Sequence, residues 1–504
     1  MEKKIVVIGA GIAGLSAGCY ARMNGYAVDV YESHRIPGGL CTAWEKGDYT
    51  IDGCLHWLMG SSEADPFNKF WRELGAVQNR KFHNHEAFYR FTNLDGRTFI
   101  LYCDVDRLEK HMMELSPEDV DTIHYFCNLI RKFSRHTMSQ DKAFELFNVF
   151  NVLSMMWKMI PVMKDFKYCL RTSLQEFADR FRDPFLREIF PIILNAGEMS
   201  MLAIISTMAA LNNKAAGFPT GGSLQFSTSI EKRLRELGGN IYYRKRVIKI
   251  LVADGKATGI VLEDGSAVAA DYVISCADMH TTLNKLLGGN YGCPQHEELF
   301  AGEKIYPSSV QVSFGVNMDL SEEPDCVSDL YKLREPIEIG KRKMEWLGIR
   351  NFSFDPTLAP KEKTVIECFF YSDDFRFWEV LYKNKRAYKA EKERIAACVA
   401  KELEHKYPGF SSHIEVVDVA TPMTYVRYTG NYKGSYMTWV MSPDFMKKYQ
   451  LIQKDLPGLK NFWLSGMWVL PPGGVPTGAK TSRDVLQIIC KLDRRKFRTT
   501  EPKL

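Results

Sequence analysis

The pattern of apolar and polar positions is most regular in the first forty residues. Residues 4–8 form a short apolar run rich in β-branched side chains, which is typical of a buried parallel strand. A glycine-rich turn follows, and residues 15–24 then have a helical pattern that ends at Gly25. Residues 27–31 predict a second strand, with Glu32 at its end. Strand, glycine turn, helix and strand in this order predict the first unit of a nucleotide-binding α/β fold.

The glycine turn carries Gly9, Gly11 and Gly14, with Ala13 between the last two. In a dinucleotide site the first glycine allows a tight turn, the second lets a pyrophosphate approach, and the third lets helix and strand pack closely. The first N–H groups of the helix attract the phosphates, and Glu32 is placed to accept hydrogen bonds from a ribose. Glycine spacing alone is weak evidence, but the whole unit predicts a dinucleotide site. The alternative is a glycine-rich turn without a ligand.

A second glycine pair follows Glu32 closely. Gly38 and Gly39 indicate that the backbone again lies close to the ligand, which fits a dinucleotide with an extended second half, such as FAD. His56 and Trp57 come after a predicted bend. They are expected either to face the ring system of the ligand or to fill a domain interface.

The pattern changes from about residue 79 and returns twice to the nucleotide type. A β-hairpin is predicted over 88–102, and helices from Ser116 and Pro117 to about residue 213. We therefore predict an α/β protein with a discontinuous Rossmann-type FAD-binding domain and an α+β substrate domain. The predicted FAD-binding parts are 1–78, 214–288 and 459–504, and the substrate-domain parts are 79–213, mostly helical, and 289–458.

One segment of the helical part is unusually apolar. Residues 144–163 are rich in Phe, Met and Trp, and Glu145 and Lys158 are their only charges. Three interpretations are open: a plain core helix, a pliable wall for a long apolar substrate, or a helix that dips into a membrane surface.

Composition narrows the class of protein. The chain has 504 residues, 45% of them hydrophobic, and a formal charge of only +5, which predicts no nucleic-acid partner. Its twelve cysteines show no metal-ligand spacing, so we expect no metal and a reduced, cytoplasmic compartment. No segment has the length and apolarity of a membrane span. The basic stretch 491–498 predicts a solvated end or a peripheral contact with an anionic membrane, on its inner face.

Four stretches together resemble a known family: the phytoene desaturase, carotenoid isomerase and retinol saturase group of FAD-dependent oxidoreductases, within the amine-oxidase-like flavoproteins. They are the N-terminal glycine unit with Glu32 and the Gly38–Gly39 pair, the segment from Phe218 to Gly222, the stretch 420–431, and Gly466 with residues 473–476.

The resemblance implies roles for particular residues. Gly9, Gly11, Ala13 and Gly14 would hold the pyrophosphate and Glu32 the adenosine ribose. Gly38, Gly39 and Leu40 would lie along the ribityl-pyrophosphate, and Val247 would meet the adenine by its backbone. Gly466, Val475 and Pro476 would lie beside the inner end of the flavin. Two positions depart from the family: Gly18 replaces the usual alanine, and residues 467–471 are bulkier and lack an acid seen in several relatives.

The resemblance also implies the chemistry, which is desaturation, saturation or isomerisation of carbon–carbon bonds. The expected substrate is a small molecule with a long apolar chain. No second glycine unit is visible, so the electron partner stays open among NAD(P)H, a quinone, oxygen and a carrier protein. Candidates for a proton partner are Glu198, His56 and Tyr425. Glu198 stands among apolar residues, where burial would raise its pKa, or else it is an exposed helix-end acid.

Two other classes remain open. A flavin amine or amino-acid oxidase would need a polar pocket and an aromatic cage. A non-enzymatic relative that binds prenylated proteins would not need the intact glycines and Glu32. The apolar-substrate hypothesis requires a large pocket that is not lined mainly by charges.

Overall fold

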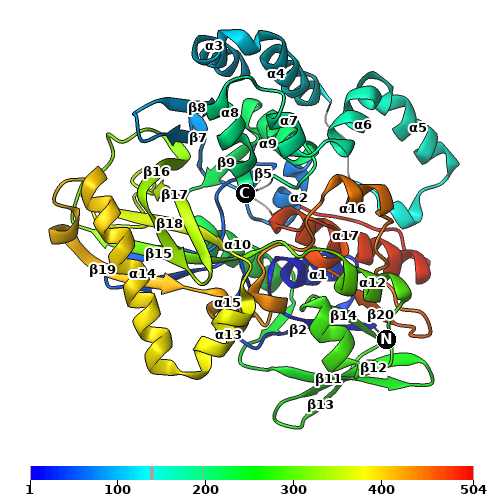
Figure 1. Ribbon diagram of the computed structural model, residues 1–504. Coiled ribbons are helices and arrows are strands. Elements are labelled where there is room, and N and C mark those ends of the chain that lie inside the picture. The colour runs from blue at the N-terminus through cyan, green and yellow to red at the C-terminus, as the bar shows by residue number, and fades with distance from the viewer. Residues whose placement is uncertain (1, 137–140, 196, 503–504) are drawn as a thin grey trace.

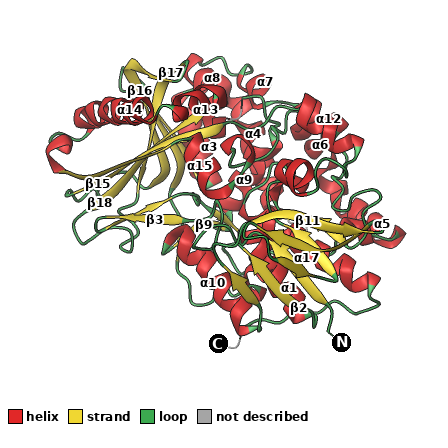
Figure 2. Cartoon of the chain, turned by 90° about the horizontal axis from the view of Figure 1, so that it is seen from below, coloured by secondary structure: helices red, strands yellow, loops and turns green. Residues whose placement is uncertain are grey.

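A five-stranded parallel sheet organises the nucleotide-binding part of the molecule. The computed structural model describes residues 2–136, 141–195 and 197–502. The sheet has the order β10-β2-β1-β14-β20, and every neighbouring pair is parallel. Its strands are β1 (Lys4–Ile8), β2 (Ala27–Tyr31), β10 (Asn240–Tyr242), β14 (Tyr272–Ser275) and β20 (Phe462–Leu464). Three distant stretches of the chain therefore meet in one sheet. Figure 2 shows this sheet at the label β2, beside α1.

Both faces of this sheet are covered. On β1, Ile5 and Val7 pack against α1 (Ile12–Met23), α10 (Gly222–Glu236) and α17 (Val475–Leu492). Val6 and Ile8 point the other way, toward a small antiparallel sheet. That sheet contains β11 (Val247–Ala253), β12 (Lys256–Leu262) and β13 (Ala267–Ala269). A strand buried on both faces explains why β1 is apolar at every position after Lys4.

A seven-stranded sheet forms the second domain, with the order β19-β15-β18-β17-β16-β7-β8. Only β16 and β7 pair in parallel. The sheet takes β7 (Ala87–Thr92) and β8 (Thr98–Tyr102) from the first intervening block. From the second it takes β15 (Ser308–Val316), β16 (Cys326–Ile339), β17 (Arg342–Asn351), β18 (Thr364–Ser372) and β19 (Ile414–Ala420). The long helix α14 (Lys385–Lys406) packs against it (Figure 1).

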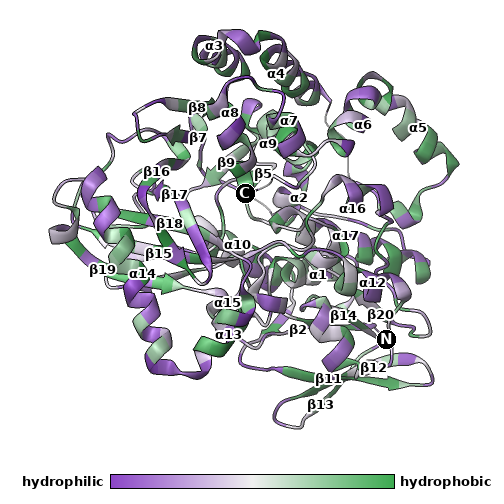
Figure 3. Cartoon of the chain, viewed as in Figure 1, coloured by the Kyte–Doolittle hydropathy of each residue, from purple (hydrophilic) through white to green (hydrophobic). Residues whose placement is uncertain are grey.

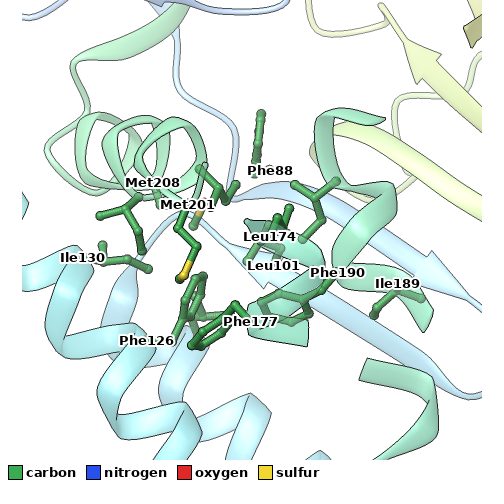
Figure 4. Packing of buried hydrophobic residues seen from close by; sticks show 14 of the residues in the cluster. Phe88, Leu101, Phe126, Ile130, Leu174, Phe177, Ile189, Phe190, Met201 and Met208 are labelled. Atoms are coloured by element: carbon green, nitrogen blue, oxygen red, sulfur yellow. The ribbon is translucent and has the colours of Figure 1, made fainter. Parts of the chain in front are cut away.

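A helical layer covers the other end of this sheet. It contains α3 (Val105–Leu115), α4 (Val120–Arg135), α7 (Leu174–Ala178), α8 (Pro184–Ile189) and α9 (Leu202–Asn212). Phe126, Phe177 and Phe190 meet at its centre with ring centroids 5.4–6.1 Å apart (Figure 4). Phe88 and Leu101 join this core from the sheet, so the two intervening blocks form one domain.

Shorter elements connect these layers. They are β3 (Ala43–Lys46), β4 (Tyr49–Asp52), β5 (Leu58–Met59), α2 (Asn68–Glu73), β6 (Phe82–His83), α5 (Val149–Met159), α6 (Met163–Arg171), β9 (Ala216–Pro219), α11 (Met279–Thr281), α12 (Pro294–Gly302), α13 (Phe375–Lys383), α15 (Pro422–Thr429) and α16 (Pro443–Lys448). Within the described residues, no helix combines the length and apolarity needed to cross a bilayer.

Most predicted elements are present, with one local difference at the start of the helical part. The hairpin forms as expected, closed by a hydrogen bond from Asn93 N to Arg97 O of 2.9 Å. Ser116 does not cap the next helix; its hydroxyl donates to Asp119, and Pro117 starts a short 3-10 turn instead. The fold class is confirmed, whereas the exact domain boundaries stay a prediction.

The core interpretation of residues 144–163 is wrong. None of the eleven residues of α5 is buried, and this helix lies at the outer edge of the molecule (Figures 1 and 3). The basic stretch 491–498 is mostly exposed, as expected of a solvated end, but some of its side chains contact the body of the molecule. Arg495 donates to the carbonyl oxygens of Asn24 and Gly25, and Phe497 packs on Tyr20.

Candidate functional site

A cleft of about 1250 Å³ opens where the strands of the five-stranded sheet end. Gly9 follows β1, Glu32 follows β2, Cys276 follows β14 and Ser465 follows β20, and all four residues line the cleft. In parallel sheets the carboxyl ends of the strands share one edge, which is where ligands bind in open α/β folds. The opposite wall comes from the second domain, including Asp418, Tyr425 and Tyr436.

The start of α1 forms one part of this edge. Gly11 is its N-cap and supplies no side chain, so the first N–H groups of the helix open into the cleft beside Ile12 and Ala13. Gly38 N donates to Ala10 O at 2.9 Å, which places the second glycine pair alongside the first turn. Gly38 has a φ of +106°, and a Cβ there would overlap the carbonyl oxygen of Cys41, so only glycine fits.

Glu32 is 8% exposed and has two roles at the end of β2. Its Oε2 accepts from Ala10 N at 2.7 Å, and its Oε1 accepts from His34 N at 2.7 Å. The carboxylate therefore braces the glycine turn as well as lining the cleft. The sequence indicated only the second role, as an acceptor for a ribose.

The last stretch of the chain supplies a second helix start. Gly474 is the N-cap of α17 and again offers no side chain, and Gly474, Val475 and Gly478 line the cleft. Gly466 lies beside them, with its N–H donated to Thr481 Oγ1 at 2.9 Å. Two helix N-termini thus face the same space, which favours a ligand with negative charge at two separate places.

Ten of the twelve predicted cofactor residues line the cleft: Gly9, Gly11, Ala13, Glu32, Gly38, Gly39, Leu40, Val247, Gly466 and Val475. Gly14 and Pro476 do not. Gly14 lies beneath the turn, where a Cβ would overlap the carbonyl oxygen of Gly9, so its role is the close packing of helix and strand. Pro476 lies in the first turn of α17, where its missing N–H costs no hydrogen bond, and does not line the cleft.

The three proton-partner candidates lie in different surroundings. Tyr425 lines the cleft, accepts a hydrogen bond from Ser309 Oγ at 3.1 Å, and burial raises its pKa to about 12. His56 packs on Trp57 and Phe369 outside the cleft lining, and burial lowers its pKa well below the ordinary value. The buried acid expected at Glu198 is wrong: its side chain is 64% exposed and pairs with Lys304 at 2.7 Å, because it lies on a surface turn.

Sequence reasoning missed several lining residues. Asp278 accepts from Thr281 N at 2.8 Å and from Tyr432 N at 2.9 Å, and burial raises its pKa to about 6. Asn431 accepts from Trp468 Nε1 at 2.9 Å. Asp278 could have been found from its place just after the strand over 272–275, since such positions gather at the ligand edge.

An aromatic wall continues from the cleft into the second domain. Tyr436 lines the cleft and packs against Tyr306, Phe369 and Tyr371, with centroids 5.6–6.5 Å apart. Most of the lining residues are uncharged. The pocket is therefore large and not lined mainly by charges, as the apolar-substrate hypothesis requires.

One group of metal-type donors lies elsewhere. Asp325 Oδ1 is 2.9 Å from His83 Nε2 and 2.6 Å from His85 Nδ1. Burial lowers the pKa of His85. Hydrogen bonds account for this arrangement, which joins the entry to β7 with the entry to β16.

The cleft residues fit a flavin dinucleotide. The start of α1 matches a pyrophosphate, the start of α17 the electron-rich inner end of a flavin, the buried Glu32 a ribose, and the aromatic wall a planar apolar group. The volume exceeds the range of about 300–1,000 Å³ usual for one small ligand. Space is therefore left for a substrate beside the ring.

Comparisons with known proteins agree with this geometry. The chain is 28% identical to the chloroplast prolycopene isomerase of Arabidopsis thaliana, over 86% of this chain and 73% of that one. It is also 28% identical to a neurosporene-forming phytoene desaturase of Rhodobacter capsulatus, over 56% and 54%.

Solved structures show the same fold. An oxidoreductase from Methanosarcina mazei superposes with a TM-score of 0.56 at 18% identity, over 96% of this chain and all of that one. Cyclohexylamine oxidase from Brevibacterium oxydans gives a TM-score of 0.58 at 11% identity, over 98% of this chain and all of that one. The model of the flavin-containing amine oxidoreductases matches residues 12–486. The chain is therefore a flavin-dependent oxidoreductase and belongs to the flavin-containing amine oxidoreductase family.

Proposed function

We propose that this protein uses FAD to isomerise or desaturate carbon–carbon bonds in a long, apolar polyene. The observation that carries the proposal is one continuous cleft, with a dinucleotide cradle at Gly11 and Glu32 and an aromatic wall at Tyr436. The names of the relatives, a prolycopene isomerase and phytoene desaturases, support a polyene as the substrate class.

Two features support FAD as the form of the flavin. The cradle residues come in two groups, around Gly11 and around Gly474, each at a helix start. A flavin mononucleotide would extend only from a phosphate at α1 to the ring at α17 and would leave the Glu32 end empty, whereas a dinucleotide extends from Glu32 to Gly466 along the lining. Glu32 is already bonded to two backbone N–H groups, so its charge is held at the ribose end.

The chain's own residues would orient the substrate and control one proton. A bound flavin supplies hydride transfer to and from carbon. Tyr436 and its aromatic neighbours offer a flat apolar surface and keep water away. Ser309 donates to the Tyr425 oxygen, which leaves the phenolic hydrogen free to be donated into the cleft. Because burial raises the pKa of Tyr425 to about 12, this hydrogen is held at neutral pH.

An amine oxidase is the alternative function within the family. An ammonium substrate needs a carboxylate that is free to bind it. Among the described lining acids, Glu32 and Asp278 accept from backbone N–H groups, and Asp418 pairs with Lys46 and accepts from Trp44. The fourth, Glu45, is exposed. We therefore favour the polyene over the amine.

The experiment compares the two substrate classes directly. Flavin-loaded protein is incubated anaerobically with poly-cis and all-trans carotenes or phytoene in detergent, and with putrescine or cyclohexylamine in air. We expect a change of carotene geometry or conjugation by chromatography, and no peroxide from the amines. Peroxide without carotene turnover would establish the amine oxidase, and a colourless protein that FAD cannot reconstitute would exclude both.

The same protein can be used to identify the electron partner, by adding NADH or NADPH. Bleaching of the flavin bands by NADH or NADPH would indicate a saturase, or an isomerase primed by reduction, whereas unchanged bands favour a desaturase that passes electrons to a quinone or oxygen. In this assay Tyr425→Phe should keep the flavin spectrum and lower turnover by about 10²-fold, if its hydrogen is donated in the reaction. Equal turnover would assign Tyr425 to packing alone.

A further inference from the structure

The strongest feature that the cleft does not explain is an apolar ridge on α5 and the residues next to it. We define the apolar ridge as the exposed side chains of Phe144, Val149, Phe150, Val152, Leu153, Met156, Trp157 and Ile160. They are eight of the sixteen large hydrophobic side chains that are exposed in the described chain. Phe150 is 79% exposed and Trp157 74%. Exposed apolar residues gathered in this way mark an interaction surface.

The ridge has the pattern of a helix that lies on a surface. In α5, Asn151, Ser154 and Lys158 are three and four residues apart and form one narrow polar stripe. The rest of its circumference is apolar. The helix is about 16 Å long, which is too short to cross a bilayer but long enough to lie along one.

The residues just before α5 are held to the rest of the molecule by specific contacts. Just before α5, Ala143 N donates to Gln487 Oε1 at 2.9 Å, and Glu145 pairs with the buried Lys454. Lys480 lies over the ring of Phe144 at 5.7 Å. Gln487 and Lys480 belong to α17, whose first residues line the cleft. The ridge is thus rooted on a helix of the nucleotide-binding part.

The charges of α5 and α6 that have no ion-pair partner among the described residues are positive. Among the described residues, Lys158, Lys164, Lys167 and Arg171 have no ion-pair partner. The acids of the same stretch are all engaged elsewhere. Glu145 pairs with Lys454, Asp165 with Lys132 at 2.7 Å, and Asp141 with Lys69 at 3.1 Å. A face with apolar side chains and free cations is complementary to an anionic lipid surface. It is less suited to a second copy, because two such faces would oppose like charges.

We propose that the apolar ridge docks this protein onto an anionic lipid surface. The apolar side chains of α5 enter the acyl boundary, Trp157 lies at the headgroup level, and Lys158, Lys164, Lys167 and Arg171 face lipid phosphates. A lipid surface would also hold an apolar substrate near the protein. The docking itself does not rest on the proposed function, since lipid binding needs neither flavin nor turnover.

Sedimentation with vesicles tests the apolar part. The full-length protein is mixed with vesicles of phosphatidylcholine, or of an equimolar mixture with phosphatidylglycerol. We expect binding to the mixed vesicles and a fall of at least about tenfold in the partition coefficient for Phe150→Ser/Trp157→Ser. Both side chains are exposed, so their removal leaves no cavity. Val380→Ser/Val417→Ser removes exposed apolar side chains from the second domain and should bind like the wild type.

A second pair of variants tests the charge. Lys158→Glu/Lys164→Glu should remove the preference for phosphatidylglycerol, whereas Lys341→Glu, an exposed cation on the β16–β17 turn, should not. Failure of the wild type to sediment would overturn the proposal, as would binding that the Phe150 and Trp157 changes leave intact. Sedimentation velocity without lipid tests the alternative, in which a second copy of the chain binds the ridge. A dimer that the same changes dissociate would assign the ridge to self-association instead.

Discussion

At the scale of single residues, the Glu32 carboxylate both braces the glycine turn and lines the cleft. In Glu32→Ala, Ala10 N and His34 N lose their acceptor. Each unsatisfied N–H costs about 1–3 kcal/mol, so the dissociation constant for FAD should rise at least about tenfold. Glu32→Gln keeps one acceptor oxygen and should lose less. Fluorescence titration of the apoprotein measures both, and an alanine variant that binds FAD like the wild type would contradict the bracing role.

Asp278 gives a pH dependence with a definite sign. Burial raises its pKa to about 6, compared with about 3.9 in an unfolded chain. The folded state therefore binds this proton more tightly. The contribution to stability is fully present below pH about 4 and is lost as the pH rises through about 6, by about 3 kcal/mol in total.

The measurement compares Asp278→Asn with the wild type in urea across this range. Since the variant has no titrating group at this position, its free energy of unfolding should rise by about 2 kcal/mol relative to that of the wild type between pH about 4 and about 7. A difference that does not change with pH would show that the folded pKa of Asp278 is ordinary.

Single-residue roles were the hardest to predict from the sequence. Glu198 has apolar neighbours in the chain, but its side chain turns outward to Lys304. Sequence neighbours do not determine burial on an irregular surface turn. Glu32 was predictable because its place at the end of a strand is a property of the whole unit, and Asp278 has the same property on β14.

At the scale of elements, Gly14 and Gly18 of α1 allow a controlled comparison of two glycine-to-alanine substitutions. A Cβ at Gly14 would overlap the backbone carbonyl oxygen of Gly9, whereas a Cβ at Gly18 would lie 2.9 Å from the tips of Leu234. The backbone at Gly9 cannot shift to make room for a Cβ, but the end of the Leu234 side chain can. Gly14→Ala should therefore abolish flavin-loaded protein. Gly18→Ala should keep the flavin, with a stability change below about 1 kcal/mol because helix propensity offsets the crowding.

Flavin absorbance per protein and thermal unfolding check this pair. Full flavin loading in Gly14→Ala would refute the packing role. Loss of flavin in Gly18→Ala would show that Leu234 cannot shift.

Elements with a regular pattern of apolar residues were predictable from the sequence. Elements whose burial depends on tertiary contacts were not. The units around β1, α10 and α17 follow their sequence patterns closely. The long strands β16 and β17 lack such a pattern, because part of their length faces solvent with charged residues. For α5, apolar composition favoured a core helix, and only the tertiary structure shows that the described residues leave its side chains unburied.

At the scale of the whole molecule, flavin should act as a cross-link between chain segments. The lining residues Gly11, Val247 and Gly474 come from three stretches. Saturation at 100 times the dissociation constant contributes about 2.7 kcal/mol, so FAD should raise the midpoint of thermal unfolding measurably. AMP reaches only the Glu32 end and should raise it less. Equal shifts with AMP and FAD, in a dye-based unfolding assay, would argue against a ligand that bridges the segments.

The overall architecture was predictable because its three nucleotide-type segments each carry their own signal. How the two intervening blocks combine was not. The pairing of β7 with β16 joins residues that are far apart in the chain, and nothing local specifies it.

The place of β20 in the sheet has a consequence for biosynthesis. One edge of β14 pairs with β1, which precedes it in the chain. The other edge of β14 pairs with β20, which is formed only by residues 462–464. During translation a nascent chain therefore exposes an open, apolar strand edge until most of the polypeptide has left the ribosome. Such an edge invites pairing with other chains, so the yield of folded protein depends on how well chaperones shield β14 while the ribosome completes the chain.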